Sequence, residues 1–310
     1  MSTKTYNPRT RLATSGARAA TEAHLGRRPT GERVSGNLFY AFLLLMISLS
    51  MAGLAALIID AFVEGFPRLG LELFTEPTAP FPEDSGFLNA IVGSLFVIGG
   101  VIALVVPLGV GAAIYLEEYA DRERWWNRLI ELNIQNLAAV PSIVYGILGL
   151  AFIVRGPLSL GFVVAAGSIT LALLVLPTVI LAAREAIRAV PQSIRQASLA
   201  VGATQWETIR HQVLPASIPG IATGVILAVG RAIGETAPLL LVGAATFVTF
   251  VPEGFFDRYT VLPVQIFNYF ARAQQEYIIL AAAGIIVMLV MLLAMNSFAI
   301  WLRNRYEQRW

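Results

Sequence analysis

The chain contains long apolar stretches without a single Asp, Glu, Lys or Arg. Crossing the ~30 Å hydrocarbon core of a bilayer takes about 20 helical residues, because an α-helix rises 1.5 Å per residue. Five stretches reach this length, and a sixth is interrupted only by Arg231 and Glu235. They are residues 38–59, 85–116, 132–154, 156–183, 212–252 (the interrupted one) and 277–302. The pattern predicts an all-α integral membrane protein with six transmembrane helices.

The composition excludes several kinds of chemistry. Charged residues make up 14% of the chain, against about 25% in a soluble protein. There is no cysteine, and the two histidines, His24 and His211, lie far apart, so we expect no metal site. A G-x-x-x-x-G-K-[ST] phosphate loop is also absent. We therefore expect a chain that is not an enzyme, with no catalytic residue and no cofactor of its own.

The basic residues indicate the orientation. Short cytoplasmic loops carry an excess of Lys and Arg, and most of the 22 Lys and Arg lie before the first apolar stretch, in two alternate loops and at the C-terminal end. Both termini are therefore expected in the cytoplasm. Residues 1–36 are polar and basic without apolar periodicity, which predicts a disordered cytoplasmic tail before a transmembrane permease domain over 37–310. Residues 64–86, with several acidic residues and four prolines, predict an irregular outer loop.

The longest internal polar segment lies between the fourth and fifth apolar stretches, at about residues 184–215. Its apolar residues recur at helical spacing, and Gly202 is placed to end a short helix with a left-handed C-cap. A second helix over 204–213 would carry three residues on an apolar face, namely Trp206, Ile209 and Val213. Periodicity alone is equally compatible with a helix lying on lipid headgroups and with a helix that docks on a protein.

Within this segment, Gln196-Ala197-Ser198 is followed by Gly202 and then by Leu214-Pro215. The spacing resembles the E-A-A-x3-G-x9-I-x-L-P loop of ABC importer permeases, whose short coupling helix docks in a groove of the ATP-hydrolysing subunit. The sequence departs from that pattern at Gln196, where the family usually has Glu, and at Gln212, where it usually has Ile. The resemblance implies the ATPase-coupling residues Arg195, Gln196, Ala197, Ser198, Gly202 and Ala203.

Three further stretches, residues 107–119, 136–146 and 230–240, extend the resemblance. They resemble the phosphate-specific A subunits of these importers, the PstA family, and the last contains Thr236-Ala237-Pro238 directly after Gly-Glu. The resemblance runs from about Leu38 to the C-terminus and implies the type I ABC importer permease fold in the inner membrane. It implies as partners a homologous C-type permease, an ATP-binding subunit dimer that holds ATP and magnesium, and an extracytoplasmic phosphate-binding protein. It implies no nucleic-acid partner.

Arg231 and Glu235 are the charged residues inside an apolar stretch. A charge at membrane depth costs about 2.5–3.5 kcal/mol on insertion scales, so such residues usually mark a water-filled or protein-lined path. A spacing of four places both on one helix face, where they can pair. The alternative is a buried pair whose members only neutralise each other. We expect a phosphate pathway lined by Arg231 and Glu235, and the resemblance adds Thr236, Pro141 and Ser142.

The predicted function is a permease subunit that forms half of the translocation pathway of an ATP-driven phosphate importer. One alternative is a permease for another oxyanion, such as sulfate or molybdate. Another alternative, from a different class, is an ion-coupled secondary transporter, which would need no ATPase. Inverted repeats or broken helices in corresponding halves would favour the secondary transporter, and the sequence displays neither.

Overall fold

A computed structural model describes residues 30–121, 123–244 and 247–306 of the chain. All regular elements in this part of the chain are helical, as predicted. The chain divides into two compact units, Met1–Asp60 and Ala61–Trp310. Five helices are long and apolar enough to cross a membrane, or six if one sharply bent pair counts as a single span.

The first unit contains most of the helix α2 (Thr30–Gly65). This helix has apolar side chains on all sides, and they are exposed along nearly its whole length. A helix that is apolar all round belongs in a membrane or a large core rather than at a water boundary. α2 begins before the predicted tail over 1–36 ends, because Thr30–Gly36 already forms its first turns, and residues 1–29 lie outside the described residues.

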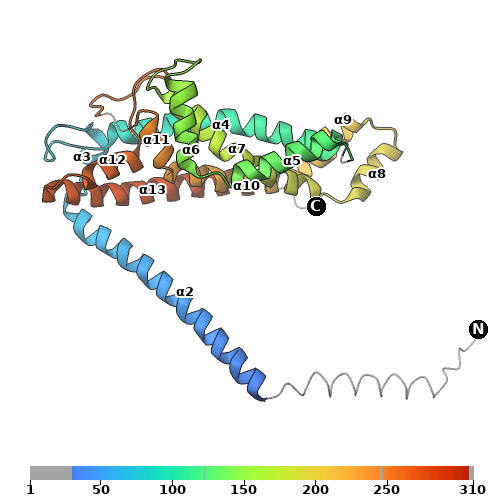
Figure 1. Ribbon diagram of the computed structural model, residues 1–310, viewed down its shortest axis with the longest axis horizontal. Helices are drawn as coiled ribbons and strands as arrows, with labels where there is room; N and C mark the ends of the chain where they lie inside the picture. The colour runs from blue at the N-terminus through green and yellow to red at the C-terminus, as the bar shows by residue number, and fades with distance from the viewer. Residues whose placement is uncertain (1–29, 122, 245–246, 307–310) are drawn as a thin grey trace, which may run out of the picture. The chain divides into compact units, whose positions relative to one another are not determined.

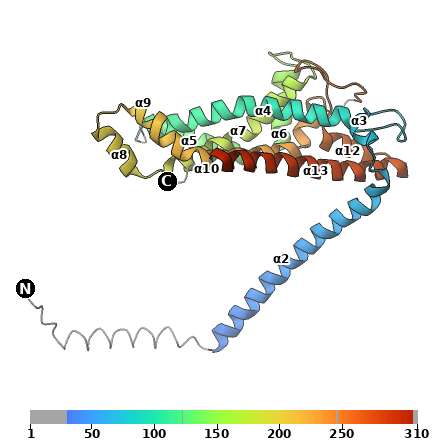
Figure 2. The same ribbon diagram turned by 180° about the vertical axis from the view of Figure 1, so that it is seen from behind.

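Four long helices run side by side in the second unit (Figures 1 and 2). They are α4 (Leu88–Ile114), α7 (Val164–Arg188), α10 (Leu214–Gly234) and α13 (Gln275–Tyr306). α7 is the most buried of the four, because 67% of its most apolar 18-residue stretch is buried. Small residues allow close packing in lipid, where there is little hydrophobic force between helices. On α10, a Cβ added at Gly224 would lie only 2.4 Å from the Ala182 side chain of α7.

The predicted span over 132–154 is a sharply bent pair of helices. Two helices replace it, α5 (Trp125–Ala138) and α6 (Ser142–Leu148), and α6 continues as the π-helical turn η3 (Gly149–Val154); the two directions differ by 104°. Pro141 lies at the break in an extended conformation (φ −57°, ψ 137°). Proline disfavours helical geometry in the residue before it and cannot donate a backbone hydrogen bond, so the helix stops at this point. The predicted fourth span starts late for a similar local reason, since Gly161, with φ +76°, lies in a turn before α7.

The predicted loop helix over 204–213 is the start of the fifth span. α9 (Gln205–Thr208) opens with a capping box made by Thr204 and Glu207, then continues through the π turn η4 (Ile209–Val213) into α10. Together they form one 30-residue apolar helix. Ile209 and Val213 are buried as expected, whereas Trp206 is exposed. The π turn, with i→i+5 hydrogen bonds, winds less per residue and so rotates Val213 away from the face of Trp206.

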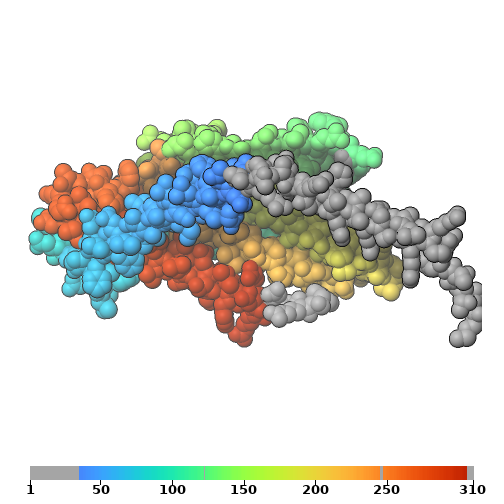
Figure 3. Space-filling view, turned by 90° about the horizontal axis from the view of Figure 1, so that it is seen from below, coloured from blue at the N-terminus to red at the C-terminus, as the bar shows by residue number. Residues whose placement is uncertain are grey.

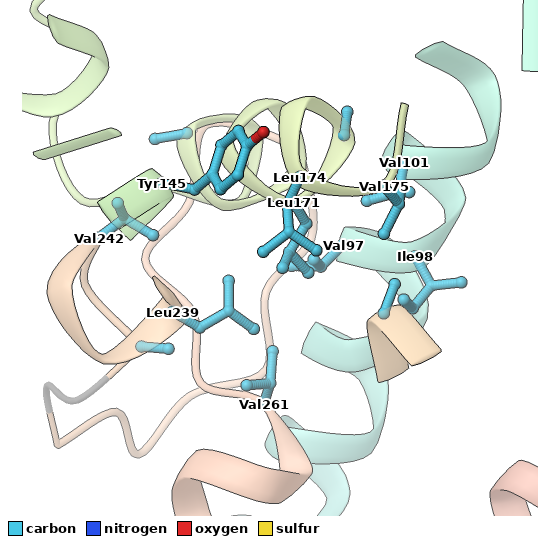
Figure 4. Close-up of a cluster of buried hydrophobic side chains, with 14 of the residues drawn as sticks. Val97, Ile98, Val101, Tyr145, Leu171, Leu174, Val175, Leu239, Val242 and Val261 are labelled. Carbon is cyan, nitrogen blue, oxygen red and sulfur yellow. The ribbon is translucent and has the colours of Figure 1, made fainter. Parts of the chain in front are cut away.

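The fifth span ends at Gly234, well inside the predicted stretch over 212–252, because Glu235 is extended (φ −75°, ψ 114°). The chain then forms the short helix α11 (Ala237–Leu241) and, after a loop, α12 (Leu262–Phe270). Figure 4 shows Leu239 and Val261 from this segment beside Leu171 of α7, and all three belong to one buried cluster. The remaining elements are η1 (Phe66–Arg68), α3 (Glu72–Thr75), η2 (Tyr115–Tyr119) and α8 (Gln192–Ala200). Residues 64–86 thus contain short helical turns within the expected loop.

Candidate functional site

The two charges of the fifth span form an ion pair at the end of α10. Arg231 lies in the last turn of the helix, and its Nε is 3.3 Å from Oε1 of Glu235, the first residue beyond the helix. The Arg231 side chain is 58% exposed and the Glu235 side chain 16%. The guanidinium therefore points out of this chain's own helix bundle. Arg231 is thus not buried within this chain, whereas Glu235 is largely covered.

The packing of α10 on α7 shows how deep this pair lies. Gly220 packs on Ala186 and Gly224 on Ala182, so the two helices run antiparallel in a fixed register. Continued for two further turns, the register brings Arg231 level with the middle of α7. The neighbouring Ala232 belongs to the same buried cluster as core residues of α7. A charge at this depth would cost about 2.5–3.5 kcal/mol or more against lipid, so the exposed face of Arg231 requires water or protein beside it.

The other predicted pathway residues lie at the two helix breaks. Thr236 is the N-cap residue of α11, while Pro141 and Ser142 open α6. α6 packs directly on α11, since a Cβ added at Gly146 would lie 2.7 Å from the Cα of Pro238. Only glycine allows this approach. The structure thus brings the two breaks onto neighbouring elements, although no hydrogen bond or ion pair recorded among the described residues joins Pro141 or Ser142 to the charged pair.

Residues 184–215, called the coupling segment after the loop they resemble, lie at one end of the second unit, opposite α3 and α12 (Figures 1 and 3). α8 ends at Ala200 and Gly202 has φ +93°, so the predicted glycine-terminated helix is present. Along α8, Gln196 and Ala197 are exposed, and Ala203 beyond it is half-buried. Leu199 and Val201 are exposed as well, so this end of the helix offers apolar surface. The Ser198 hydroxyl is occupied by a 2.9 Å hydrogen bond with Thr208 of α9, which fixes the angle between the two short helices.

Arg195 points into the chain rather than away from it. Its Nη2 lies 2.7 Å from Oε1 of Glu118 in η2, and the two side chains are only 11% and 10% exposed. Its guanidinium also donates to the backbone carbonyls of Val190 and Ile187. The side chain predicted to couple to the ATPase therefore joins the coupling helix to two other parts of this chain.

A second buried ionic cluster lies beside it. The Glu117 side chain is 3% exposed and contacts Arg184 (6% exposed) and Arg188 of α7, and Arg184 also donates to Glu131 of α5. Sequence reasoning used the arginines only to set the orientation and gave the glutamates no role. Two signals could have found the cluster. Arg184 and Arg188 share one helix face at a spacing of four, and Glu117 ends the neighbouring apolar stretch.

The fold and these features are those of a membrane transport subunit. Residues 105–310 match the family of binding-protein-dependent transport system inner membrane components, and the chain belongs to this family. It is accordingly a multi-pass inner-membrane permease. This membership decides against a secondary transporter, although broken helices, the feature expected of that class, are present at Pro141 and Glu235.

Two relatives and one solved structure show which transport proteins this chain resembles. The phosphate transport system permease PstA of Haemophilus influenzae is 35% identical over 76% of this chain and 82% of its own length. PstA of Yersinia pestis is 36% identical over 76% of this chain and 79% of its own length. Among solved structures, a bacterial alginate ABC transporter bound to its periplasmic protein covers 86% of this chain and 94% of the matched chain, with a TM-score of 0.65 at 16% identity. That structure supports the importer-permease fold.

Proposed function

We propose that this chain is the A-type permease subunit of an ATP-driven phosphate importer and forms half of its translocation pathway. The observation that carries the proposal is Arg231, a charge that lies level with the middle of α7 and faces out of the chain's own bundle. The similarity to two phosphate permeases supports the choice of phosphate over sulfate or molybdate. Guanidinium is suited to this role, because its planar fork of donors matches a tetrahedral oxyanion and its charge persists at low dielectric constant.

The second half of the pathway would come from a homologous C-type permease, which would face Arg231, Glu235 and Thr236. An ATP-binding subunit dimer, holding ATP and magnesium, would dock on the exposed apolar end of α8 inside the cell. A phosphate-binding protein would dock at the opposite, extracytoplasmic end, and both termini would lie in the cytoplasm. Movement of α8 during ATP hydrolysis would swing α7 and α10, so that the Arg231 face opens first outward and then inward.

Purification of the tagged chain from its native membrane tests this proposal. We expect an ATP-binding subunit and a second permease to be recovered with it. The complex reconstituted in liposomes should take up radiolabelled phosphate only with ATP inside and the phosphate-binding protein outside. Uptake driven by an ion gradient without ATP, or recovery without an ATPase, would contradict the proposal.

Gly202→Val should uncouple ATP hydrolysis from transport. A Cβ at Gly202 would meet no neighbouring atom, so the substitution adds only the strain of a left-handed backbone, about 1–2 kcal/mol, and misdirects the end of α8. The assay compares ATPase activity with phosphate uptake. Gly161→Val is the matched control, because Gly161 also has positive φ and open space around its Cβ position but lies away from the coupling segment. Normal coupling in Gly202→Val would refute the role of this cap.

Glu235→Gln should let sulfate compete with phosphate. Near neutral pH phosphate keeps at least one P–OH donor, which an ionised carboxylate accepts, whereas sulfate has no proton to offer and meets like charge. Nε of Arg231 lies 3.3 Å from Oε1 of this carboxylate. Sulfate inhibition of phosphate uptake is measured in both proteins. Should sulfate stay excluded by a well-folded variant, Glu235 would serve only to neutralise Arg231 and discrimination would lie elsewhere.

A further inference from the structure

Both short helices of the coupling segment are fastened to one residue at the end of another transmembrane helix. From α8, Arg195 places Nε at 3.1 Å and Nη2 at 2.7 Å from Oε1 of Glu118. From α9, the Gln205 side-chain amide donates to the backbone carbonyl of the same Glu118 at 2.5 Å. Glu118 belongs to the π turn η2, which continues α4. These contacts join residues 77 and 87 positions apart in the chain.

The geometry of this contact is that of a fixed joint rather than a surface ion pair. Exposed pairs contribute little, because water screens them and both side chains stay mobile. Arg195 and Glu118 are instead nearly buried, and Arg195 also donates to the carbonyls of Ile187, in the last turn of α7, and of Val190 just beyond it. Charge-assisted hydrogen bonds of this kind are short and fix the guanidinium plane. One side chain thus ties together α8, the end of α7 and the end of α4.

Through the π turn η2, the end of α4 contacts both α7 and α8. Glu117 and Glu118 are consecutive, yet Glu117 binds the arginines of α7 while Glu118 binds α8. The coupling segment is connected through the backbone to α7 before it and to α10 after it. Among its described residues beyond the end of α7, the polar contacts with the end of α4 are made by Arg195 and Gln205, beside an apolar cluster in which Val213 packs with Ala113 of α4.

We infer that the contact between Arg195 and Glu118 is a rigid link through which the coupling helix moves α4, so that α8 and the cytoplasmic end of α4 travel as one body during transport. Arg195 is then a positioning residue that acts within this chain. The inference rests on the proposed function, since it takes α8 as the element that receives motion from the ATPase. It adds α4 to the helices that this motion reaches.

Distances between spin labels in the intact transporter test the link. The chain has no cysteine of its own, so Ser193→Cys on α8 and Tyr119→Cys on η2, both exposed, can be labelled selectively in a complex with cysteine-free partners. With native Arg195, the distribution of distances between the two labels should be narrow and the same in the nucleotide-free and ATP-bound states. In Arg195→Gln it should broaden and differ between the two states. A distance that changes with nucleotide before Arg195 is altered would overturn the inference.

The second readout is the ratio of phosphate transported to ATP hydrolysed. Arg195→Gln should lower phosphate transported per ATP hydrolysed by about tenfold, within the 5–150-fold range typical of coupling between sites. Glu118→Gln should do the same, and the double variant should be no worse than either, because both remove one contact. Additive losses would overturn the link. Arg124→Gln is the control, since it breaks an exposed pair with Asp121 nearby and should change neither readout.

Gln205→Ala provides a milder test if Arg195→Gln fails to accumulate. It removes only the hydrogen bond to the Glu118 carbonyl and should broaden the same label distance; an unchanged distribution would count against the link. Different results contradict the proposed function and the rigid link. If the chain with native Arg195 is purified without an ATPase, the proposed function is contradicted. If coupling is normal in Arg195→Gln, only this inference is contradicted.

Discussion

Replacing Arg231 by Lys should reduce phosphate uptake about 10- to 150-fold while the amount of transporter in the membrane stays constant. Lys keeps a point charge but loses the planar fork that donates two parallel hydrogen bonds to an oxyanion. Hydrogen bonds to charged groups are worth about 1.5–3 kcal/mol, which sets the range. An ammonium also loses its proton more readily than a guanidinium when it leaves water. Initial rates of radiolabelled phosphate uptake in proteoliposomes measure the effect.

Arg258→Lys is the control for this experiment. Arg258 is exposed in the loop before α12, outside the apolar helices, so the same chemical change there should leave uptake intact. Uptake at the original rate in Arg231→Lys would show that the guanidinium is not a substrate contact. Arg231 would then serve only as the partner of Glu235.

Removing the Glu117 carboxylate should destabilise the chain by about 3–5 kcal/mol. Breaking a buried ion pair leaves the remaining charge desolvated without compensation, and Glu117 and Arg184 are 3% and 6% exposed. Arg184 keeps Glu131 at 3.0 Å, so the loss should fall toward the lower end. The thermal stability of the purified transporter and its abundance in the membrane should both fall in Glu117→Ala.

Two companion variants separate lost charge from lost packing. Glu185→Gln removes another carboxylate from Arg188, but that side chain is 70% exposed, and surface pairs contribute about 0–1 kcal/mol. The double variant Glu117→Leu with Arg184→Leu should recover much of the stability, because apolar residues often replace a buried pair at no cost. If Glu117→Ala were as mild as Glu185→Gln, the cluster would have no structural role.

The helices themselves were largely predictable from sequence, because charge-free runs of more than 20 residues have few other uses. Whether Pro141 bends its helix could not be decided from sequence, for a physical reason. Prolines are tolerated within membrane helices when neighbours satisfy the freed backbone groups, and Pro107 and Pro177 do lie inside continuous helices. Whether a proline breaks a helix depends on what packs around it, here the close approach of Gly146 to Pro238.

Part of the candidate site was likewise predictable from sequence and part was not. Arg231 and Glu235 could be found because a charge stands out in an apolar stretch and its partner lies four residues away. The partners of Arg184 and Arg195 lie 67 and 77 residues distant in sequence. They meet only after α4 and α7 have packed together. Local spacing carries no information about such a pair, so Arg195 was predicted to face the ATPase.

The exposed guanidinium of Arg231, level with the middle of α7, has a consequence for the chain before it assembles with its partner subunits. A newly inserted copy has to hold Arg231 against lipid or draw water into the bilayer, and either state is costly. Assembly removes that cost by covering the charge. An orphan copy should therefore be the less stable form in the cell, exposed to membrane proteases, and the supply of companion subunits would set how much of it persists. Arg231 would in this way help to match the amount of this chain to that of its partner subunits, in addition to its role in transport.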